Sequence, residues 1–391
     1  MSQSIAYKKA IALLHKATSN NGFLASAENI TNYHRVWARD GVICGLAALL
    51  DGNQKLVQTF KETLQTLRTH QHEIGNIPSN VAFEDKKPSV SFGGLAGRVD
   101  TISWFIIGVF NYVNFTNDTA FLTKNKKATE KGFLLLESWE FNTSDLIYVP
   151  RSGNWADEYI TEGHILYDQL LRLWALRCYQ KWFPDKQIGD KIARVTKKLQ
   201  QNFRKKKDSE TPYHPKAYEN LKDTSYWQTS VSPSGYQTQY DGFANALAIL
   251  LRIDKEYDAK VIDYSEKLRN ILPLRLLPAF WPAIQQKDWD WKLLENNCKY
   301  EFRNHPYEFH NGGTWQLVNG FYAAALAKNG HKKLAQQVLE KLHECNAVED
   351  WSFYECFNSK TKAPVGVKNC TWSAAAAIIA KQYIKGKELV V

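Results

Sequence analysis

Two acidic residues, Asp157 and Glu355, stand in aromatic-rich segments far apart in the sequence. Asp157 follows Trp155, and Glu355 lies among four aromatic residues between positions 351 and 357. A carboxyl group beside an aromatic face is partly desolvated, which raises its pKa and suits it to exchange a proton near neutral pH. A carboxylate in such surroundings either finds a hydrogen-bond donor or performs chemistry. Asp157 is therefore a candidate general acid, although it equally fits an ordinary acid in a surface turn, and Glu355 is a candidate catalytic carboxylate.

Other acidic residues compete for these roles. Glu158 directly follows Asp157 and is a rival for the general acid, while Asp100 and Asp241 are further acids that a pocket could include. Asp241 precedes an apolar helical segment, so it equally fits the N-cap position of a helix. The sequence leaves these alternatives open.

The segment 33–41 places cationic, anionic and aromatic side chains directly before an apolar stretch. Arg39 offers a rigid fork of donors and Asp40 offers acceptors, so together they suit the vicinal hydroxyls of a sugar. Trp37 adds a flat apolar face on which a sugar ring could stack. The simpler alternative makes Asp40 a helix N-cap and leaves Arg39 on the surface.

The segment 307–315 combines a glycine pair with polar and aromatic side chains. Gly312 and Gly313 allow the backbone to approach a ligand closely. His310 and Asn311 would add directional hydrogen bonds, and Trp315 opens the next helical segment. This density of polar groups favours a binding loop over a plain helix entry.

Twelve segments with helical spacing of apolar residues must position these groups. They span 5–16, 42–50, 55–69, 101–114, 119–137, 163–182, 190–204, 241–252, 260–271, 315–329, 332–344 and 371–384. Long loops at 75–97, 148–162 and 278–313 separate some of them. Because the segments do not repeat a common pattern, an open solenoid is disfavoured. We predict an all-α fold, an (α/α)6 barrel of six hairpins in which inner and outer helices alternate, as one domain over residues 1–391.

Composition excludes several classes of function. The net charge is +10, but the basic residues are scattered instead of forming one stripe, which argues against nucleic-acid binding. The six cysteines show neither a CxxC pair nor zinc-ligand spacing, so we expect free thiols, no metal and no cofactor. The N-terminus lacks the apolar core of a signal peptide and no run approaches a membrane span, so we expect a cytoplasmic protein without membrane contact.

The motifs, taken in order, resemble those of (α/α)6-barrel glycoside hydrolases, specifically family 100 (alkaline/neutral invertases) and related debranching-type α-glucosidases. Arg35-Val-Trp-Ala-Arg-Asp40 is similar to the family's R-V-W-x-R-D, and His310-Asn-Gly-Gly-Thr-Trp315 to H-N-G-G-S-W. Gly97-Arg-Val-Asp100 resembles the invertase G-R-V-x-x-V-D with a shortened spacer. Asp157 and Glu355 fall where the family carries its general acid and its second catalytic carboxylate. The resemblance spans nearly the whole chain, from Arg35 to Ala374.

The resemblance implies hydrolysis of a small α-glycoside, either an α-glucoside or sucrose, supplied as a disaccharide or small oligosaccharide. Asp157 would protonate the glycosidic oxygen and Glu355 would activate water, with inversion if the carboxyl groups are roughly 6.5–9.5 Å apart. Trp37, Arg39, Asp40 and Asp100 would hold the sugar, His310 and Asn311 would orient its hydroxyls, and Trp155, Trp315 and Trp351 would wall the pocket. Related barrels often pair through outer helices, so a homo-oligomer is one expectation for the assembly.

The sequence also departs from the invertase pattern. Asp157 is followed by Glu158 and Tyr159, where invertases have two arginines, and the Trp-Ala-Asp triplet favours the glucosidase-like relatives. Two alternative functions remain on the same barrel. A sugar epimerase would use a histidine pair drawn from His34, His164, His305 and His310, and a non-catalytic barrel would bind carbohydrate unchanged.

Overall fold

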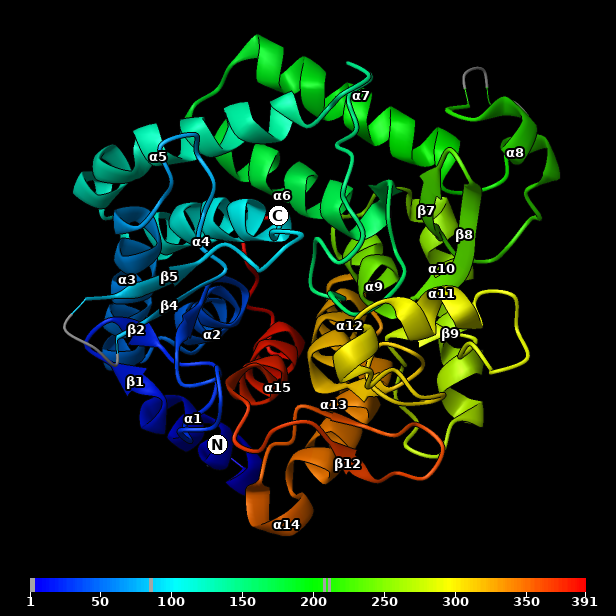
Figure 1. The fold of residues 1–391 in the computed structure, drawn as a ribbon. Helices are drawn as coiled ribbons and strands as arrows, with labels where there is room; N and C mark the ends of the chain where they lie inside the picture. Colours follow the sequence, from blue (N-terminus) through cyan, green and yellow to red (C-terminus); the bar gives the residue numbers. More distant parts are fainter. Residues whose placement is uncertain (1–3, 84–86, 207–208, 210–211) are drawn as a thin grey trace.

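The computed structural model describes residues 4–83, 87–206, 209 and 212–391. Within them, six helices form an inner ring in which each helix packs against the next and the last packs against the first. Figure 1 shows this ring with a second layer of helices around it. The inner helices are α2 (Ala38–Asp51), α4 (Asp100–Thr116), α6 (Leu166–Trp182), α9 (Gly242–Leu250), α12 (Gln316–Lys328) and α15 (Thr371–Ile384).

The outer layer contains one long helix for each inner one. Its members are α1 (Ile5–Lys16), α3 (Gln54–Thr69), α5 (Thr119–Ser138), α7 (Lys186–Asn202), α10 (Lys255–Ile271) and α13 (Lys332–Asn346). Outer helix α3 packs on α2, α5 on α4, and so on around the ring to α1 on α15. The predicted (α/α)6 barrel, with alternating inner and outer helices, is therefore confirmed.

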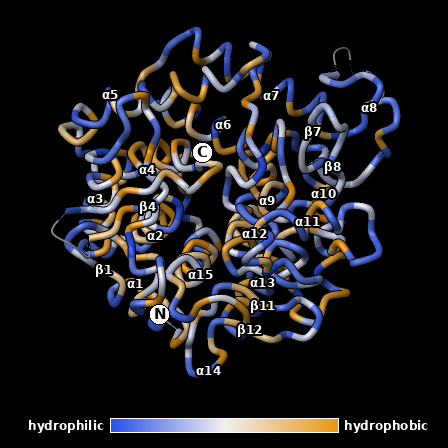
Figure 2. Tube along the Cα trace, in the orientation of Figure 1, coloured by the Kyte–Doolittle hydropathy of each residue, from blue (hydrophilic) through white to orange (hydrophobic). Residues whose placement is uncertain are grey.

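The inner helices are apolar on all sides, whereas the outer helices are apolar on one side only. In α4 every residue from Asp100 to Val113 is buried, so this helix needs apolar neighbours on all sides. In α7, by contrast, only four residues are buried and the remaining faces carry lysine, arginine and glutamine. Figure 2 shows the same contrast, because hydrophobic colour concentrates along the inner helices.

Short elements decorate the ends of the barrel. They are the helices α8 (Pro215–Asn220), α11 (Trp291–Asn296) and α14 (Val348–Trp351), with a 3-10 turn at Lys299–Glu301. Four small antiparallel sheets have the orders β1-β2, β3-β4-β5, β6-β7-β8-β9 and β10-β11-β12. Their strands are Thr18–Ser19, Gly22–Phe23, Val36–Trp37, Asn80–Ala82, Ser89–Ser91, His164–Ile165, Gln228–Ser232, Gly235–Asp241, Phe280–Trp281, Thr314–Trp315, Cys356–Phe357 and Pro364–Val365, numbered β1 to β12. Among these described strands, only those of the β7–β8 hairpin are longer than three residues.

Two helix starts resolve alternatives that the sequence left open. Helix α2 begins at Ala38 with Trp37 at the N-cap, so Asp40 lies in the first turn and Arg39 is buried. The surface position considered for Arg39 and the N-cap role considered for Asp40 are therefore wrong. Asp241 is the N-cap of α9, since its carboxylate accepts hydrogen bonds from the backbone N–H groups of Phe243 and Ala244, both at 2.9 Å.

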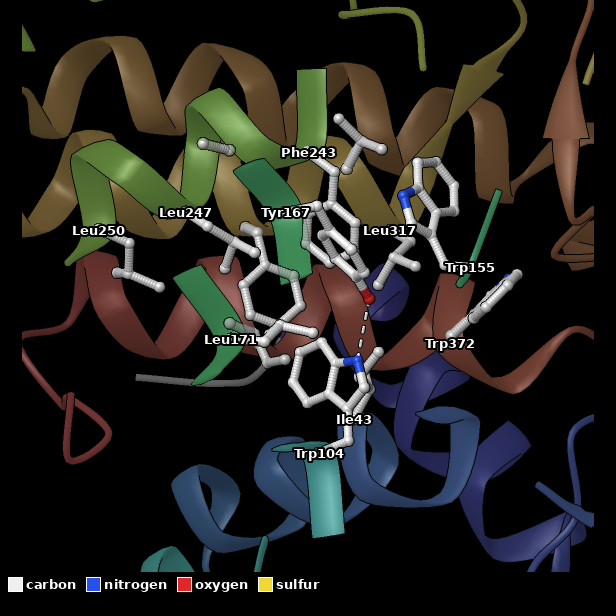
Figure 3. Close-up of a cluster of buried hydrophobic side chains, with 14 of the residues drawn as sticks. Ile43, Trp104, Trp155, Tyr167, Leu171, Phe243, Leu247, Leu250, Leu317 and Trp372 are labelled. Carbon is white, nitrogen blue, oxygen red and sulfur yellow. Dashed lines mark hydrogen bonds between the residues drawn. The ribbon is translucent and has the colours of Figure 1, made fainter. Parts of the chain in front are cut away.

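Aromatic side chains fill the middle of the ring. Trp104 of α4 contacts Trp174 of α6, Phe243 of α9 and Phe321 of α12, with ring centroids 5.9–6.5 Å apart. Its indole N–H donates to the Tyr167 hydroxyl at 3.0 Å, the dashed line in Figure 3. The barrel centre is thus a packed core, and a binding site must lie at one end.

Gly320 lets α12 approach α15 closely. A Cβ at this position would lie 2.6 Å from the carbonyl oxygen and 2.7 Å from the Cα of Ala376, both backbone atoms that cannot turn aside. We expect Gly320→Ala to lower the free energy of unfolding by about 1–3 kcal/mol, because the inner ring must open to admit the methyl group. Thermal unfolding would measure the loss. Ala335→Gly on α13 serves as the comparison, because it removes a buried methyl group instead of adding one. Gly330→Ala is unsuitable for this purpose, because the φ of +88° at Gly330 would strain any side chain there.

The described residues contain no helix that is both long and apolar enough to cross a membrane. All six cysteines are free thiols, and five of them are buried. No disulfide therefore contributes to holding the described barrel closed.

Candidate active site

A cavity of about 710 Å³ opens at the end of the barrel where the inner helices begin. Strands β3 and β10 lead directly into α2 and α12, and they deliver Trp37 and Trp315 to the cavity wall. Eight of the predicted site residues line it, which are Trp37, Arg39, Asp40, Trp155, Asp157, His310, Trp315 and Glu355. The structure thus brings four distant segments of the sequence to one place.

Glu355 lies directly before β11 and is only 4% exposed. The Tyr33 hydroxyl donates to its Oε1 at 2.7 Å, and the backbone N–H of Val367 approaches Oε2 at 3.4 Å. Burial raises the pKa of Glu355 to about 7, against the opposing effects of the Tyr33 bond and the Arg303 charge. This carboxyl group can therefore change protonation state near neutral pH.

The backbone around Glu355 is shaped to hold it. Gly366 has φ +80°, and a Cβ there would lie 2.2 Å from the Glu355 Oε2 atom. Only glycine combines this conformation with this close approach. The segment directly after β12, which contains Gly366 and Val367, therefore lies against one side of the carboxylate, while Tyr33 binds its other oxygen.

Asp157 lies in the loop between α5 and β6. Its Oδ2 accepts a hydrogen bond from the Arg98 guanidinium at 2.5 Å, and its side chain is 32% exposed. Arg98 also donates to the backbone carbonyls of Gly97 and Ser152, so it ties two loops to Asp157. The sequence predicted that Trp155 would desolvate Asp157; in the structure the carboxylate is bound by the Arg98 guanidinium and remains partly exposed.

The rival acid Glu158 has a different environment. It does not line the cavity, and Arg303 holds it through both Nη2 and Nε, the latter at 3.2 Å. Burial raises the pKa of Glu158, while Arg303 opposes that shift. Between the two neighbours, only Asp157 faces the space that a substrate would occupy.

Arg39 and Asp40 sit deep in the cavity, on the first turn of α2. Arg39 Nη1 donates to Asp100 Oδ2 at 2.9 Å, and Tyr167 donates to the same oxygen at 3.2 Å. Burial raises the pKa of Asp40 to about 6, with Arg39 opposing. Asp100 is buried behind Arg39 and does not line the cavity, so it fixes the guanidinium from the far side.

His310 and the tryptophans form an apolar wall with unpaired polar atoms. The His310 ring stacks on Trp315 with centroids 5.0 Å apart and planes 7° apart, and it meets Trp155 edge to face at 5.0 Å. Neither ring nitrogen of His310 has a hydrogen-bond partner among the described residues, nor do the indole N–H groups of Trp155 and Trp372. Burial lowers the pKa of His310 to about 4, so the ring is neutral at neutral pH. Figure 3 shows Trp155 and Trp372 at one side of the cluster of buried side chains, and Trp315 contacts both, with ring centroids 5.6 and 5.7 Å apart.

Two further predicted binding residues do not line the cavity. Asn311 is fully buried, and its amide bonds to the backbone of Ile284 and Asn304, which closes the loop below His310. Trp351 packs its ring against Phe353, with centroids 6.0 Å apart. Both residues shape loops around the site instead of facing its interior.

The cavity also contains residues that the sequence did not single out. Tyr33, Arg303, Phe309 and Trp372 line it together with the segment 300–302. Tyr33 begins the segment 33–41, and Trp372 lies just before Ala374, where the family resemblance ends, so their neighbourhood was a usable signal. Arg303 stands in a loop without a motif, and nothing in its spacing indicates the contact with Glu158. Among the described residues, no group of three or more His, Cys, Asp or Glu side chains is arranged to hold a metal ion.

Known structures share this architecture. A mannosylglycerate hydrolase of glycoside hydrolase family 63 from Thermus thermophilus superposes with a TM-score of 0.69 at 12% identity, covering 96% of this chain and 99% of that one. A bacterial glucoamylase complexed with acarbose gives a TM-score of 0.68 at 14% identity, covering 98% of this chain and 56% of that one. These similarities concern the fold.

Sequence comparison is more specific. Alkaline/neutral invertase CINV2 of Arabidopsis thaliana is 23% identical over 421 residues, which cover 92% of this chain and 74% of the invertase. Cytosolic invertase 1 of Oryza sativa subsp. japonica is 22% identical over 431 residues, covering 92% and 73%. The profile of the family described as alkaline and neutral invertase matches residues 6–209 and 216–386. The chain therefore belongs to the alkaline and neutral invertase family and is a glycoside hydrolase.

Proposed function

We propose that this enzyme hydrolyses a small α-glycoside, an α-glucoside or sucrose, with Asp157 as general acid and Glu355 as general base. The observation that carries the proposal is the presence of both carboxylates in one cavity, whose wall includes His310, Trp155 and Trp372 with buried polar atoms that lack hydrogen-bond partners among the described residues. Buried polar atoms without partners cost free energy unless a ligand or water pairs them, so the wall suits a polyhydroxylated substrate.

In the proposed mechanism the terminal sugar occupies the deep end, beside Arg39 and Asp40. Asp157 protonates the glycosidic oxygen, while ionised Glu355 takes a proton from a water molecule that attacks the anomeric carbon from the other side. Tyr33 orients the Glu355 carboxylate. An inverting outcome follows if that water fits between the sugar and Glu355.

The experiment is incubation with sucrose, trehalose, maltose, isomaltose and kojibiose, followed by NMR from the first minute. Release of β-glucose from one of them would support the proposal and its inverting stereochemistry. Release of α-glucose would keep the hydrolase but overturn inversion. No release from any of the five would contradict the proposed substrate class.

The epimerase alternative needs two histidines at one reaction centre. Of the four candidates only His310 lines the cavity, whereas His34, His164 and His305 do not. The comparisons give this alternative no support, and we do not propose it. For location we propose the cytoplasm, supported by six free thiols and a cytosolic relative, although other relatives are named mitochondrial or chloroplastic.

The pH dependence of turnover should report Glu355. The base works only when ionised, so activity should fall as the pH drops through its pKa of about 7. In Tyr33→Phe the carboxylate loses a hydrogen bond that lowers its pKa, so the midpoint of the acid limb should rise by roughly one pH unit. Tyr240→Phe is the matched control, since it removes a buried hydroxyl bonded to Ser265 at 2.7 Å outside the cavity. A shift of equal size in both variants would contradict the role of Tyr33.

A further inference from the structure

The loop before β10 is fastened to the loop that carries Asp157. Arg303 grips the Glu158 carboxylate, and the Asn304 amide donates to the Glu158 carbonyl at 3.1 Å. The Asn297 amide donates to the Tyr159 carbonyl, also at 3.1 Å. Three contacts thus hold the 297–304 segment against residues 158 and 159, immediately beside the candidate general acid.

Arg303 differs from the other cavity arginine in its depth. Its side chain is 48% exposed, whereas that of Arg39 is 8% exposed. Both line the cavity, so Arg39 marks the deep end and Arg303 the mouth. Under the proposed function the terminal sugar lies deep, and the group that leaves must therefore lie toward Arg303.

The Arg303 guanidinium uses two of its three nitrogens in contacts with Glu158. Nε and Nη2 contact Glu158, and the ring of Phe309 lies 4.8 Å from the guanidinium carbon. Nη1 has no hydrogen-bond partner among the described residues. A fixed donor at the mouth of a sugar pocket is suited to a hydroxyl of the leaving group, because the planar fork is already oriented.

The pairing of charges at the cavity also restricts the chemical class of the leaving group. Arg303 is matched by Glu158, and Arg39 is matched by Asp100. Since each of these guanidinium groups at or beside the cavity already faces a carboxylate, an anionic leaving group would gain little attraction there. A neutral, hydroxyl-bearing leaving group fits these paired charges.

We propose that Arg303 is the specificity-determining residue for a neutral sugar leaving group, which it binds through Nη1, and that Glu158 is its positioning residue. This inference rests on the proposed function. It assigns Glu158 a task that differs from proton donation, although Glu158 adjoins Asp157.

The test compares two substrates that share a glucosyl group but differ in what leaves. One is the disaccharide that the wild-type enzyme cleaves best, and the other is α-D-glucosyl fluoride, whose leaving group has no hydroxyl. For Arg303→Gln we expect kcat/KM to fall about 10- to 100-fold on the disaccharide, mainly through KM, and by no more than about threefold on the fluoride. Arg303→Lys, which keeps the charge but not the fork, should fall between wild type and Arg303→Gln.

Glu158 is tested by a double-mutant cycle. Glu158→Gln should weaken the disaccharide reaction, but adding it to Arg303→Gln should change nothing further, because it acts only through Arg303. Arg151→Gln is the matched control, since Arg151 pairs with Glu162 at 2.9 Å in the same loop outside the cavity. Rates are compared on each variant's alkaline plateau, because loss of the Arg303 charge also raises the pKa of Glu355.

Several outcomes would overturn the inference. An equal loss of kcat/KM on both substrates would mean either that Arg303 contacts the sugar in the deep end of the cavity or that the substitution damages the fold. Thermal unfolding of Arg303→Lys would distinguish these two explanations. No loss on either substrate would remove Arg303 from recognition, and a full Glu158→Gln effect in the Arg303→Gln background would make Glu158 act by itself. If the wild-type enzyme cleaved neither substrate, the proposed function itself would have failed.

Discussion

Glu355→Gln should reduce kcat by roughly 10²- to 10⁴-fold on the disaccharide and on α-D-glucosyl fluoride alike. Water must lose a proton as it attacks whichever group leaves, so a base is required in both reactions. The amide keeps the shape of the carboxylate and can still accept from Tyr33, but it cannot take the proton. Steady-state kinetics with both substrates would measure the loss.

Stability provides an independent control for this variant. The folded-state pKa of Glu355 is raised above its unfolded value, so its contribution to stability is fully present at low pH and is lost as the pH rises through about 7. Glu355→Gln removes a buried charge and should therefore be more stable than the wild type at pH 8, with a smaller difference at pH 5. An inactive variant that is also less stable at pH 8 would indicate damage to the fold. Glu308→Gln, outside the cavity, should keep activity.

The barrel was predictable because its signal is local. The inner helices are apolar on all sides and the outer helices on one, and both patterns are visible in the sequence of each segment, as α4 and α7 illustrate. The starts of helices were less predictable. Arg39 and Asp40 look like residues that precede a helix, yet the β3–β4 pairing places them in its first turn.

The site was predictable only where chemistry and motif coincide. Glu355 and His310 stand in segments whose composition already indicates function, and both reach the cavity. Asn311 looks equally functional in the sequence, but its amide is used by the backbone of its own loop. Side-chain type alone cannot distinguish an amide that binds substrate from one that closes a loop.

Contacts between residues far apart in the chain could not be predicted from the sequence, for a physical reason. Arg303 and Glu158 are separated by 145 positions, and the Tyr33–Glu355 hydrogen bond spans 322. Such contacts depend on how the loops fold over the barrel end, which no local pattern encodes. They also give the two neighbouring acids different environments, since Glu158 pairs with Arg303 and Asp157 lines the cavity.

The loss of activity caused by removing the general acid should depend on which leaving group the substrate carries. Asp157→Asn should lower kcat/KM on the disaccharide by roughly 10²- to 10⁴-fold, because a sugar alkoxide leaves only when protonated. Fluoride leaves without a proton donor, so hydrolysis of α-D-glucosyl fluoride should fall by no more than about tenfold.

The comparison of the two substrates distinguishes the proposed role of Asp157 from the roles of Glu355 and Glu158. A loss on both substrates would assign Asp157 to binding, through its contact with Arg98. Retention of disaccharide activity would show that the proton comes from elsewhere, and Glu158 would then be the first residue to test in a background without Arg303. Glu162→Gln is the matched control, because that side chain lies in the same loop and pairs with Arg151 away from the cavity. Only an Asp157-specific, leaving-group-dependent loss is consistent with an acid that delivers its proton to the glycosidic oxygen.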